Sequence, residues 1–476
     1  MGETGRLGAK VRALRRREGL TQVALAERLG ISASYLNLIE HNRRPLPAPL
    51  LIKVVQLFQI DVQALAPDDE PQLAEDLMEA FGDELFDGHE LAAADVHELA
   101  AGVPPVGRAV LALYRAYRET RQKAEGLAAK LFEGQELTTN GSTLPSEEVS
   151  DLLQRHLNHF PELEHAAERL WRSARLDPES LYPKMTDHLE RARGVEVRVE
   201  RVGALAGATR RYDPQRKVLL LSEALGRASR NFQVAHMIGL LEHPDLLDRL
   251  AADGQLTSEE SHALARVALA NYFAAAVLMP YEPFLTTARS ERYDIELMAT
   301  RFDCTFEQVC HRLTTLSRPG AEGIPFHLVR IDVAGNISKR FSASGMHYMR
   351  FSAGCPRWNV YGAFLTPGVI RVQLSQMPDR TLYFSIARTV RRDWRFRATP
   401  AVLAIELGCE ARHAGEMVYS EGIDLADPSA AVPIGVTCRL CPRIDCQERA
   451  FPPMQHPLHV DENTRGPSFY APVLTD

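Results

Sequence analysis

Three cysteines near the end of the chain are spaced as ligands of a metal centre. Cys438 and Cys441 form a CxxC pair, and Cys446 follows them within nine residues of a loop flanked by Gly and Pro. Cys409 lies 29 residues upstream of the pair and can complete a set of four thiols. Because neighbouring thiolates repel unless a metal shares their charge, such a set is typical of an iron–sulfur cluster or a structural zinc ion. Spacing alone does not choose between these metals, and a metal-free redox pair is the plainer alternative.

A second chemical pattern is incomplete. Residues 231–242 resemble the helix that carries H-E-x-x-H in zinc peptidases, where two His bind the metal and the Glu is the general base. His236 keeps the first ligand, but Met237 stands where the base should be and Leu240 where the second His should be. No Asp or Glu occurs at residues 261–281, where a third ligand would come from. We therefore expect no enzyme, and we interpret His236 as a satisfied core or pocket histidine rather than a lone ligand.

Residues 324–400 combine short β-like segments with interleaved basic and aromatic side chains. These are Lys339, Arg340, Tyr348, Arg350, Arg357, Trp358, Arg371 and Arg388. For any one of them, an exposed strand position without function is the simpler interpretation. Together they offer guanidinium forks for phosphates and rings for stacking, as a phosphate-bearing, adenine-containing ligand needs. A GxGxxG fingerprint and a Walker A motif are both missing from the sequence, so a Rossmann or P-loop nucleotide site is not supported.

The elements that position these residues begin with a basic N-terminal head. Residues 1–65 hold ten Lys or Arg against five acids, whereas residues 66–107 hold twelve acids and no Lys or Arg. A basic module followed by an acidic connector is typical of a DNA-binding head joined to a part that does not bind DNA.

The head has the helix caps and the tight turn that are typical of a helix-turn-helix. Apolar spacing predicts helices over Thr21–Leu29 and Ser32–Glu40, with Thr21 and Ser32 as N-caps and a tight turn at Gly30 between them. The second helix is expected in the major groove, and residues just after it suit phosphate contact. The predicted DNA contacts are Gln22, Ser32, Ala33, Ser34, Asn37, Asn42, Arg43 and Arg44.

The connector and the middle of the chain are less distinctive. Val110, Leu113, Tyr114 and Tyr117 share one helical face, which fits a linker helix packed on its own domain and a dimer helix equally well. Further on, alternating apolar residues predict strands near 195–199 and 217–221, ahead of the His236 helix. Cys304 and Cys310 are expected as buried apolar fillers, and Cys355 receives no assignment.

Length and composition limit the class of protein. A chain of 476 residues predicts about three domains, and no apolar run approaches the roughly 18 residues of a membrane span. Seven cysteines without a recognisable export signal indicate a reducing compartment rather than a disulfide framework. We expect a soluble cytoplasmic protein with no membrane partner.

The quoted segments also carry two family resemblances. GLTQ, LAERLGIS, SYLNLIE and NRRP make the head resemble the phage-repressor (XRE or Cro-type) helix-turn-helix family, which implies dimers on double-stranded operator DNA. NYFAAAVLMPYEPFL, DVAGNISKRFSASG, CPRWNVYGAF and PIGVTCRLCPRIDCQERAFPP make nearly the whole chain resemble the short-chain fatty acyl regulators. Members of that family are XRE-type transcription factors whose middle domain resembles a degenerate ImmA/IrrE peptidase.

The second resemblance implies an effector and a cofactor. It implies binding of a short-chain acyl-coenzyme A, with contacts assigned to Lys339, Arg340, Tyr348 and Arg371. It also favours a [4Fe–4S] cluster over zinc on Cys409, Cys438, Cys441 and Cys446. The expected assembly is a homodimer, or a pair of dimers.

These observations predict a multidomain protein, mainly α with α+β. The expected domains are a helix-turn-helix bundle (1–66), a helical connector or dimerisation region (67–147), a degenerate zincin-like domain (148–320) and a mixed β, Cys-rich C-terminal domain (321–476). The expected function is regulation of transcription in short-chain acyl-CoA metabolism. One alternative is a DNA-binding regulator that responds to redox or to a protein partner through a zinc or iron–sulfur site on four cysteines, without binding acyl-CoA. Another is a zinc peptidase fused to a DNA-binding head, which Met237 and Leu240 oppose.

Overall fold

The computed structural model describes residues 11–453, except 13, 16–17, 19, 41–43, 45, 59–69, 87–90, 134–144, 347, 349–353, 393–400 and 426. The chain divides into two compact units. The first comprises residues 1–141, 349–352 and 449–476, and the second comprises residues 142–348 and 353–448.

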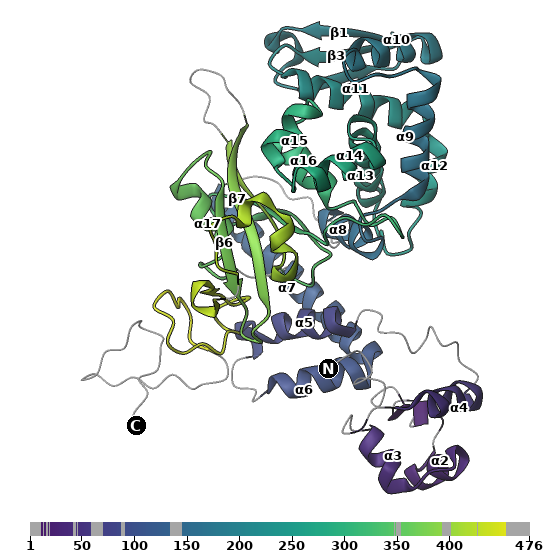
Figure 1. The fold of residues 1–476 in the computed structure, drawn as a ribbon, viewed down its shortest axis with the longest axis vertical. Helices are drawn as coiled ribbons and strands as arrows, with labels where there is room; N and C mark the ends of the chain where they lie inside the picture. Colours follow the sequence, from purple (N-terminus) through teal and green to yellow (C-terminus); the bar gives the residue numbers. More distant parts are fainter. Residues whose placement is uncertain are drawn as a thin grey trace. The chain divides into compact units, whose positions relative to one another are not determined.

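The first unit opens with the predicted helix-turn-helix (Figure 1). Its helices are α2 (Gln22–Leu29), α3 (Ala33–Glu40) and α4 (Ala48–Phe58). The Thr21 hydroxyl accepts the N–H of Ala24 at 3.2 Å, and the Ser32 hydroxyl accepts the N–H of Tyr35 at 3.1 Å. Gly30 ends α2 with a φ of 73°, a left-handed conformation that suits glycine. The predicted caps and turn are confirmed.

A second helical group follows in the same unit. It consists of α5 (Glu70–Phe81), α6 (Ala93–Gly102) and α7 (Pro104–Glu133). Tyr114 of α7 is buried and donates its hydroxyl to Asp83 at 2.8 Å, and Arg118 pairs with the same carboxylate at 3.2 Å. Leu113 was expected beside Tyr114 on the apolar face, but it is 72% exposed. Leu111 lies in the core and is 4% exposed, so the face of α7 that packs within this unit includes Leu111 and not Leu113.

The second unit begins with helices around a small sheet. The helices are α8 (Pro145–Arg155), α9 (Pro161–Ser173), α10 (Leu181–Arg193), α11 (Arg227–Glu242), α12 (Pro244–Ala251), α13 (Glu259–Leu278), α14 (Tyr281–Ser290), α15 (Ile295–Arg301) and α16 (Phe306–Leu313). The strands are β1 (Glu196–Glu200), β2 (Arg210–Asp213) and β3 (Val218–Ser222), in the order β1-β3-β2. β1 runs parallel to β3, and β2 runs antiparallel to it. Figure 1 shows this sheet beside α10 and α11.

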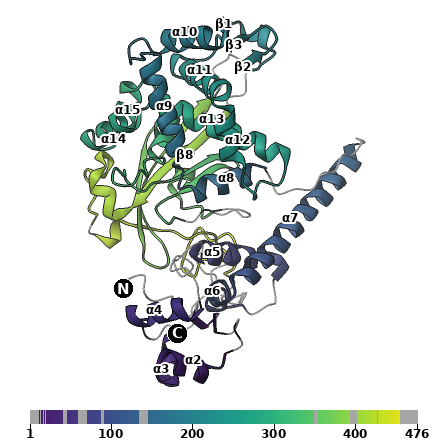
Figure 2. The ribbon, with the colours of Figure 1, turned by 90° about the vertical axis from the view of Figure 1, so that its right-hand side faces the viewer.

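A larger, mostly antiparallel sheet follows in the same unit, in the order β5-β4-β8-β7-β6-β9. Its strands are β4 (His327–Asp332), β5 (Ile337–Ser342), β6 (Arg371–Gln376), β7 (Leu382–Arg392), β8 (Ala401–Glu410) and β9 (Val432–Pro433), and the short helix α17 (Asn359–Gly362) packs on it. Apolar side chains of β7 and β8, such as Phe384 and Leu407, belong to the same core as the helices. Strand β8 of this sheet is labelled in Figure 2.

A buried ion pair ties the helices of this core together. Arg312 of α16 is fully buried and contacts both carboxylate oxygens of Glu164 of α9, at 2.6 and 2.9 Å. Tyr272 of α13 donates its hydroxyl to the same carboxylate at 2.6 Å. Burial alone would raise the pKa of Glu164, but the charge and hydrogen bonds of Arg312 lower it below its ordinary value.

Helix α13 is the one helix in the described residues that is long and apolar enough to cross a membrane. More than half of that apolar stretch is buried inside the unit, as in the core helix of a soluble protein, so the resemblance to a membrane span is weak.

Candidate functional site

The predicted DNA-reading residues lie around the start of α3. Ser34 and Asn37 are exposed on this helix, and Ala33 is half-buried. The hydroxyl of Ser32 caps the helix, so it fixes the helix start as well as facing solvent. Asn42 and Arg43 lie outside the described residues, and Arg44 is exposed with its guanidinium 5.9 Å from the Tyr35 ring centroid.

A buried carboxylate holds the two helices of the motif in place. Glu40 at the end of α3 accepts two hydrogen bonds from Arg15, at 2.6 and 3.0 Å. Gln22 at the start of α2 donates to Glu40 at 2.8 Å and to Asn37 at 3.1 Å. The side chain of Gln22 is therefore oriented by α3 within the protein itself, which favours a role in positioning.

The vestigial metal helix is α11. His236 is 3% exposed, and its Nδ1 lies 2.6 Å from Nη1 of Arg210 on β2. Since a guanidinium can only donate, Nδ1 accepts this hydrogen bond. The carbonyl of Val267 on α13 is the other partner of the ring, and burial together with the charge of Arg210 lowers the pKa of His236 to about 4. His236 is thus a neutral, satisfied histidine, as the sequence indicated.

The other two positions that correspond to the H-E-x-x-H motif hold apolar side chains packed in the core. Met237 is 5% exposed in the core, and Leu240 packs against that core. A peptidase needs a base and two further ligands around a zinc-bound water. At these positions α11 supplies the apolar side chains of Met237 and Leu240, and the guanidinium of Arg210 already donates to Nδ1 of His236. This arrangement is consistent with a peptidase-like fold that has lost the peptidase chemistry.

The loop that carries Cys438, Cys441 and Cys446, here called the cysteine loop, follows β9 and is hydrogen-bonded to the large sheet. Arg443 in this loop donates to the carbonyls of Gln376 and Met377, at 3.0 and 3.1 Å. Cys441 lies so close to Gly435 that a Cβ on that glycine would come within 2.8 Å of the sulfur. Cys438, Cys441 and Cys446 are each half-buried.

Cys355, which the sequence left unassigned, is the cysteine that the structure brings to this loop. Its N–H donates to the carbonyl of Val436 at 3.0 Å, and the neighbouring Trp358 donates its indole N–H to Gly435 at 2.9 Å. Burial and then the nearby thiols of Cys438 and Cys441 raise the pKa of Cys355 to about 11. This juxtaposition joins loops distant in sequence, which is why residue spacing did not reveal it.

Cys409 has different surroundings. It lies on β8 with no exposed surface, and its sulfur contacts that of Met417 at 3.9 Å. Burial and the carboxylates of Glu416 and Glu410 raise its pKa to about 12. The structure therefore does not bring Cys409 to the loop with the CxxC pair. Within the described ranges, no three His, Cys, Asp or Glu side chains converge closely enough to hold a metal ion.

The four residues assigned to coenzyme A do not converge on one site. Lys339 and Arg340 are neighbours on β5, so their side chains leave on opposite faces: Lys339 meets His311, and Arg340 lies 3.9 Å from Glu147. Tyr348 is buried against Trp358, and its hydroxyl has no partner in the part of the chain that the structure describes. Arg371 is on β6, which three strands separate from β5 in the sheet.

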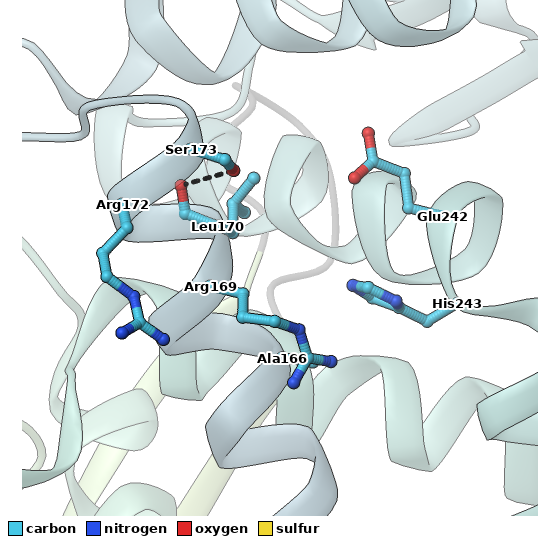
Figure 3. Close-up of a pocket in the computed structure, with 7 residues that line it drawn as sticks. All are labelled: Ala166, Arg169, Leu170, Arg172, Ser173, Glu242 and His243. Atoms are coloured by element: carbon cyan, nitrogen blue, oxygen red, sulfur yellow. Dashed lines mark hydrogen bonds between the residues drawn. The ribbon is translucent and has the colours of Figure 1, made fainter.

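The structure does contain a pocket elsewhere, between α9 and the corner that joins α11 to α12. Its volume is about 560 Å³, in the range of small-ligand sites. Ala166, Arg169, Leu170, Arg172, Ser173, Glu242 and His243 line it (Figure 3). Arg169 extends from α9 toward the wall that carries His243. Sequence reasoning missed this pocket; the signal available was a pair of Arg residues three apart on one face of a predicted helix.

Family models match three successive parts of the chain. Residues 6–67 match a helix-turn-helix domain, residues 190–314 match an IrrE N-terminal-like domain, and residues 315–470 match the C-terminal domain of short-chain fatty acyl coenzyme A regulators.

Whole-length relatives are also found. The chain is 41% identical over 465 residues to the HTH-type transcriptional regulator RamB of Mycobacterium tuberculosis, covering 96% of both proteins. It is 39% identical to the regulator PrpR of the same organism, with 96% of this chain and 93% of PrpR covered. It is 38% identical to a propionyl-CoA carboxylase regulator of Cereibacter sphaeroides, with 96% and 97% covered. A solved structure of a Mycobacterium tuberculosis transcriptional regulator superposes with a TM-score of 0.67 at 41% identity, covering 69% of this chain and all of that one.

Proposed function

The chain belongs to the family of short-chain fatty acyl coenzyme A regulators, and from this premise we propose that it controls transcription of short-chain acyl-CoA metabolism in response to an acyl-CoA. It is a helix-turn-helix transcriptional regulator rather than an enzyme. The observation that carries the first part of the proposal is the similarity over almost the whole length to transcriptional regulators, one of which is named for propionyl-CoA carboxylase.

We infer that the head reads double-stranded operator DNA through α3. Ser34 and Asn37 are exposed on this helix, and Gln22 is held against it. Helix-turn-helix heads bind two half-sites as dimers, so we propose a homodimer, or a pair of dimers, in the cytoplasm. Replacing Asn37 with Ala should weaken specific binding by roughly 1–3 kcal/mol if it reads a base, and should leave non-specific binding unchanged.

The proposed cofactor is a [4Fe–4S] cluster, with structural zinc as the alternative. Cys438, Cys441 and Cys446 supply three thiols, and we now favour Cys355 over Cys409 as the fourth because its neighbours include Cys438 and Cys441. Thiolates are the ligands that both centres require. When bound, the centre would tie the cysteine loop to the segment that starts at Cys355. The cysteines must move closer together to hold it.

A thermal-shift titration of anaerobically purified protein tests the effector. Ligands that bind only the folded state raise the melting temperature by mass action. We expect acetyl-CoA or propionyl-CoA to give a larger shift than free CoA, and the free acids to give none. If neither acyl-CoA shifts the melting temperature, the sensing part of the proposal is wrong. A redox-responsive or partner-responsive regulator, with input through the cysteine loop, then becomes the better explanation.

A further inference from the structure

We infer that helix α7 carries the surface through which two copies of this chain pair. This inference rests on the proposed function, in which two heads bind two half-sites, and it names the surface that joins the two copies. That surface, here called the α7 stripe, includes Val106, Val110, Leu113 and Tyr117. Leu113 is 72% exposed and Val106 is 48% exposed, so the outer side of the stripe is accessible to a partner.

Helix α7 uses a different face to pack on its own unit. Leu111 and Tyr114 are 4% and 3% exposed, in the core that α7 shares with α5 and α6. Arg118 lies on the same face and pairs with Asp83 at 3.2 Å. With 3.6 residues per turn, Leu113 points roughly 130° around the helix axis from the middle of that face. Packing on α5 and α6 therefore leaves the side of α7 that carries Leu113 exposed.

The exposed side of α7 is apolar where a solvated helix would be charged. Helical spacing places Ala109, Ala116 and Thr120 beside Val106 and Leu113, and all five residues are exposed. Over residues 106–120, no Lys, Arg, Asp or Glu falls within about 60° of Leu113 around the axis. On a surface helix, the side opposite the core normally carries charged and polar residues. A continuous exposed apolar stripe instead marks a protein–protein contact.

The spacing of the stripe indicates that its partner is another helix. Positions separated alternately by four and three residues run through the helix: Val106, Val110, Leu113, Tyr117, Thr120, Ala124, Leu127 and Leu131. Thr120 is the one member of this series that is neither apolar nor aromatic. An apolar a/d repeat sustained over between three and four heptads is typical of a helix that packs lengthwise on another helix.

A second copy of α7 is the partner that fits this surface. Charges that flank the a/d positions select a foreign partner helix in coiled coils, but the exposed edge of the stripe holds Ala109 and Ala116 at these flanking positions. A stable interface needs about 800 Å² from each partner, so the contact must extend along much of the helix. At 30 residues, α7 is about 45 Å long and supplies that length. In a two-fold dimer the same stripe serves both copies.

Sedimentation equilibrium of the full-length protein over a series of concentrations tests this assignment. The wild type should sediment as a dimer or as a pair of dimers. The variant Leu113→Glu should sediment with half the mass of the wild-type assembly. Its dissociation constant should rise about a hundredfold or more, because the change places two like charges in the contact between the copies. Val106→Glu should act in the same direction.

Leu365→Glu is the matched control, because it removes a leucine that is 81% exposed in the second unit and should leave the assembly unchanged. Since Leu113 and Val106 are exposed within one chain, both α7 variants should keep the helix content of the wild type in far-ultraviolet circular dichroism. Two α7 variants that sediment as the wild type does would overturn the assignment to α7 and leave the proposed homodimer standing. A wild type that is a monomer at every concentration would overturn both.

Discussion

The contact between Arg210 and His236 explains why one ligand of a zinc motif persists without zinc. The guanidinium donates to Nδ1 at 2.6 Å, and the carbonyl of Val267 faces the other side of the ring. The positive charge that a metal would bring to this histidine is thus supplied by an arginine from β2. Replacing His236 would leave that guanidinium half-buried without its partner, which gives a structural reason for the residue.

The pKa of His236 offers a direct test of this contact. Burial and then Arg210 lower it to about 4. In the variant Arg210→Gln, the amide can still donate to Nδ1 but carries no charge. We expect the pKa of His236 to rise in NMR titration, yet to stay below 6.5 because burial remains. An unchanged pKa would mean that the guanidinium does not act on this ring in solution.

Single substitutions can also decide which cysteine is the fourth ligand of the proposed cluster. We predict that Cys355→Ser lowers the iron content and visible absorbance of anaerobically purified protein to near background, because this thiol lies with Cys438 and Cys441. Cys409→Ser should keep both, since its sulfur contacts Met417 inside the core. Retention of iron by Cys355→Ser together with its loss in Cys409→Ser would restore the assignment made from the sequence.

At the scale of secondary-structure elements, short sequence signals predicted helices and strands correctly. Contacts between segments that are distant in the sequence were not predicted. The helices of the head follow from caps at Thr21 and Ser32 and a left-handed Gly30, all within a few residues of what they determine. Strands near 195–199 and 217–221 were also predicted from alternation, and β1 and β3 confirm them. Sequence patterns do not specify which distant segments pair, so the contact of the Cys355 segment with the cysteine loop and the Arg210–His236 bond both went unseen.

Strand β8 carries a carboxyl group with an unusual pKa. Glu406 is 4% exposed and accepts the N–H of Val360 at 2.8 Å. Burial raises the pKa of Glu406 to about 7, although hydrogen bonds from Val360 and Ser385 oppose this. The folded state therefore holds a proton that the unfolded state releases at lower pH. The resulting stabilisation is present below about pH 4.5 and is lost as the pH rises to about 7.

The direction of this pH dependence predicts a measurable difference in stability between the wild type and the variant Glu406→Gln. The amide oxygen can still accept the Val360 hydrogen bond, but the residue no longer titrates. Between about pH 5 and pH 8 the free energy of unfolding of the wild type should fall relative to that of the variant by on the order of 2–3 kcal/mol. Parallel pH profiles in denaturant unfolding would show that Glu406 titrates normally.

At the scale of the whole molecule, the proposed switch must obey thermodynamic linkage. The head belongs to the first compact unit, so any communication between it and an effector bound elsewhere on the chain is a coupling free energy between two sites. If propionyl-CoA changes operator affinity by a certain factor, operator DNA must change propionyl-CoA affinity by the same factor. Couplings of this kind are typically about 5- to 150-fold.

We therefore predict that two independent titrations give the same factor of change in affinity. Fluorescence anisotropy with labelled operator, selected from random DNA, gives the change in DNA affinity on adding propionyl-CoA. Calorimetry gives the change in propionyl-CoA affinity on adding the same operator. Two reproducible factors that differ would mean that effector and DNA are linked through a change in assembly state rather than within one species, because a homodimer that pairs further brings protein concentration into both equilibria.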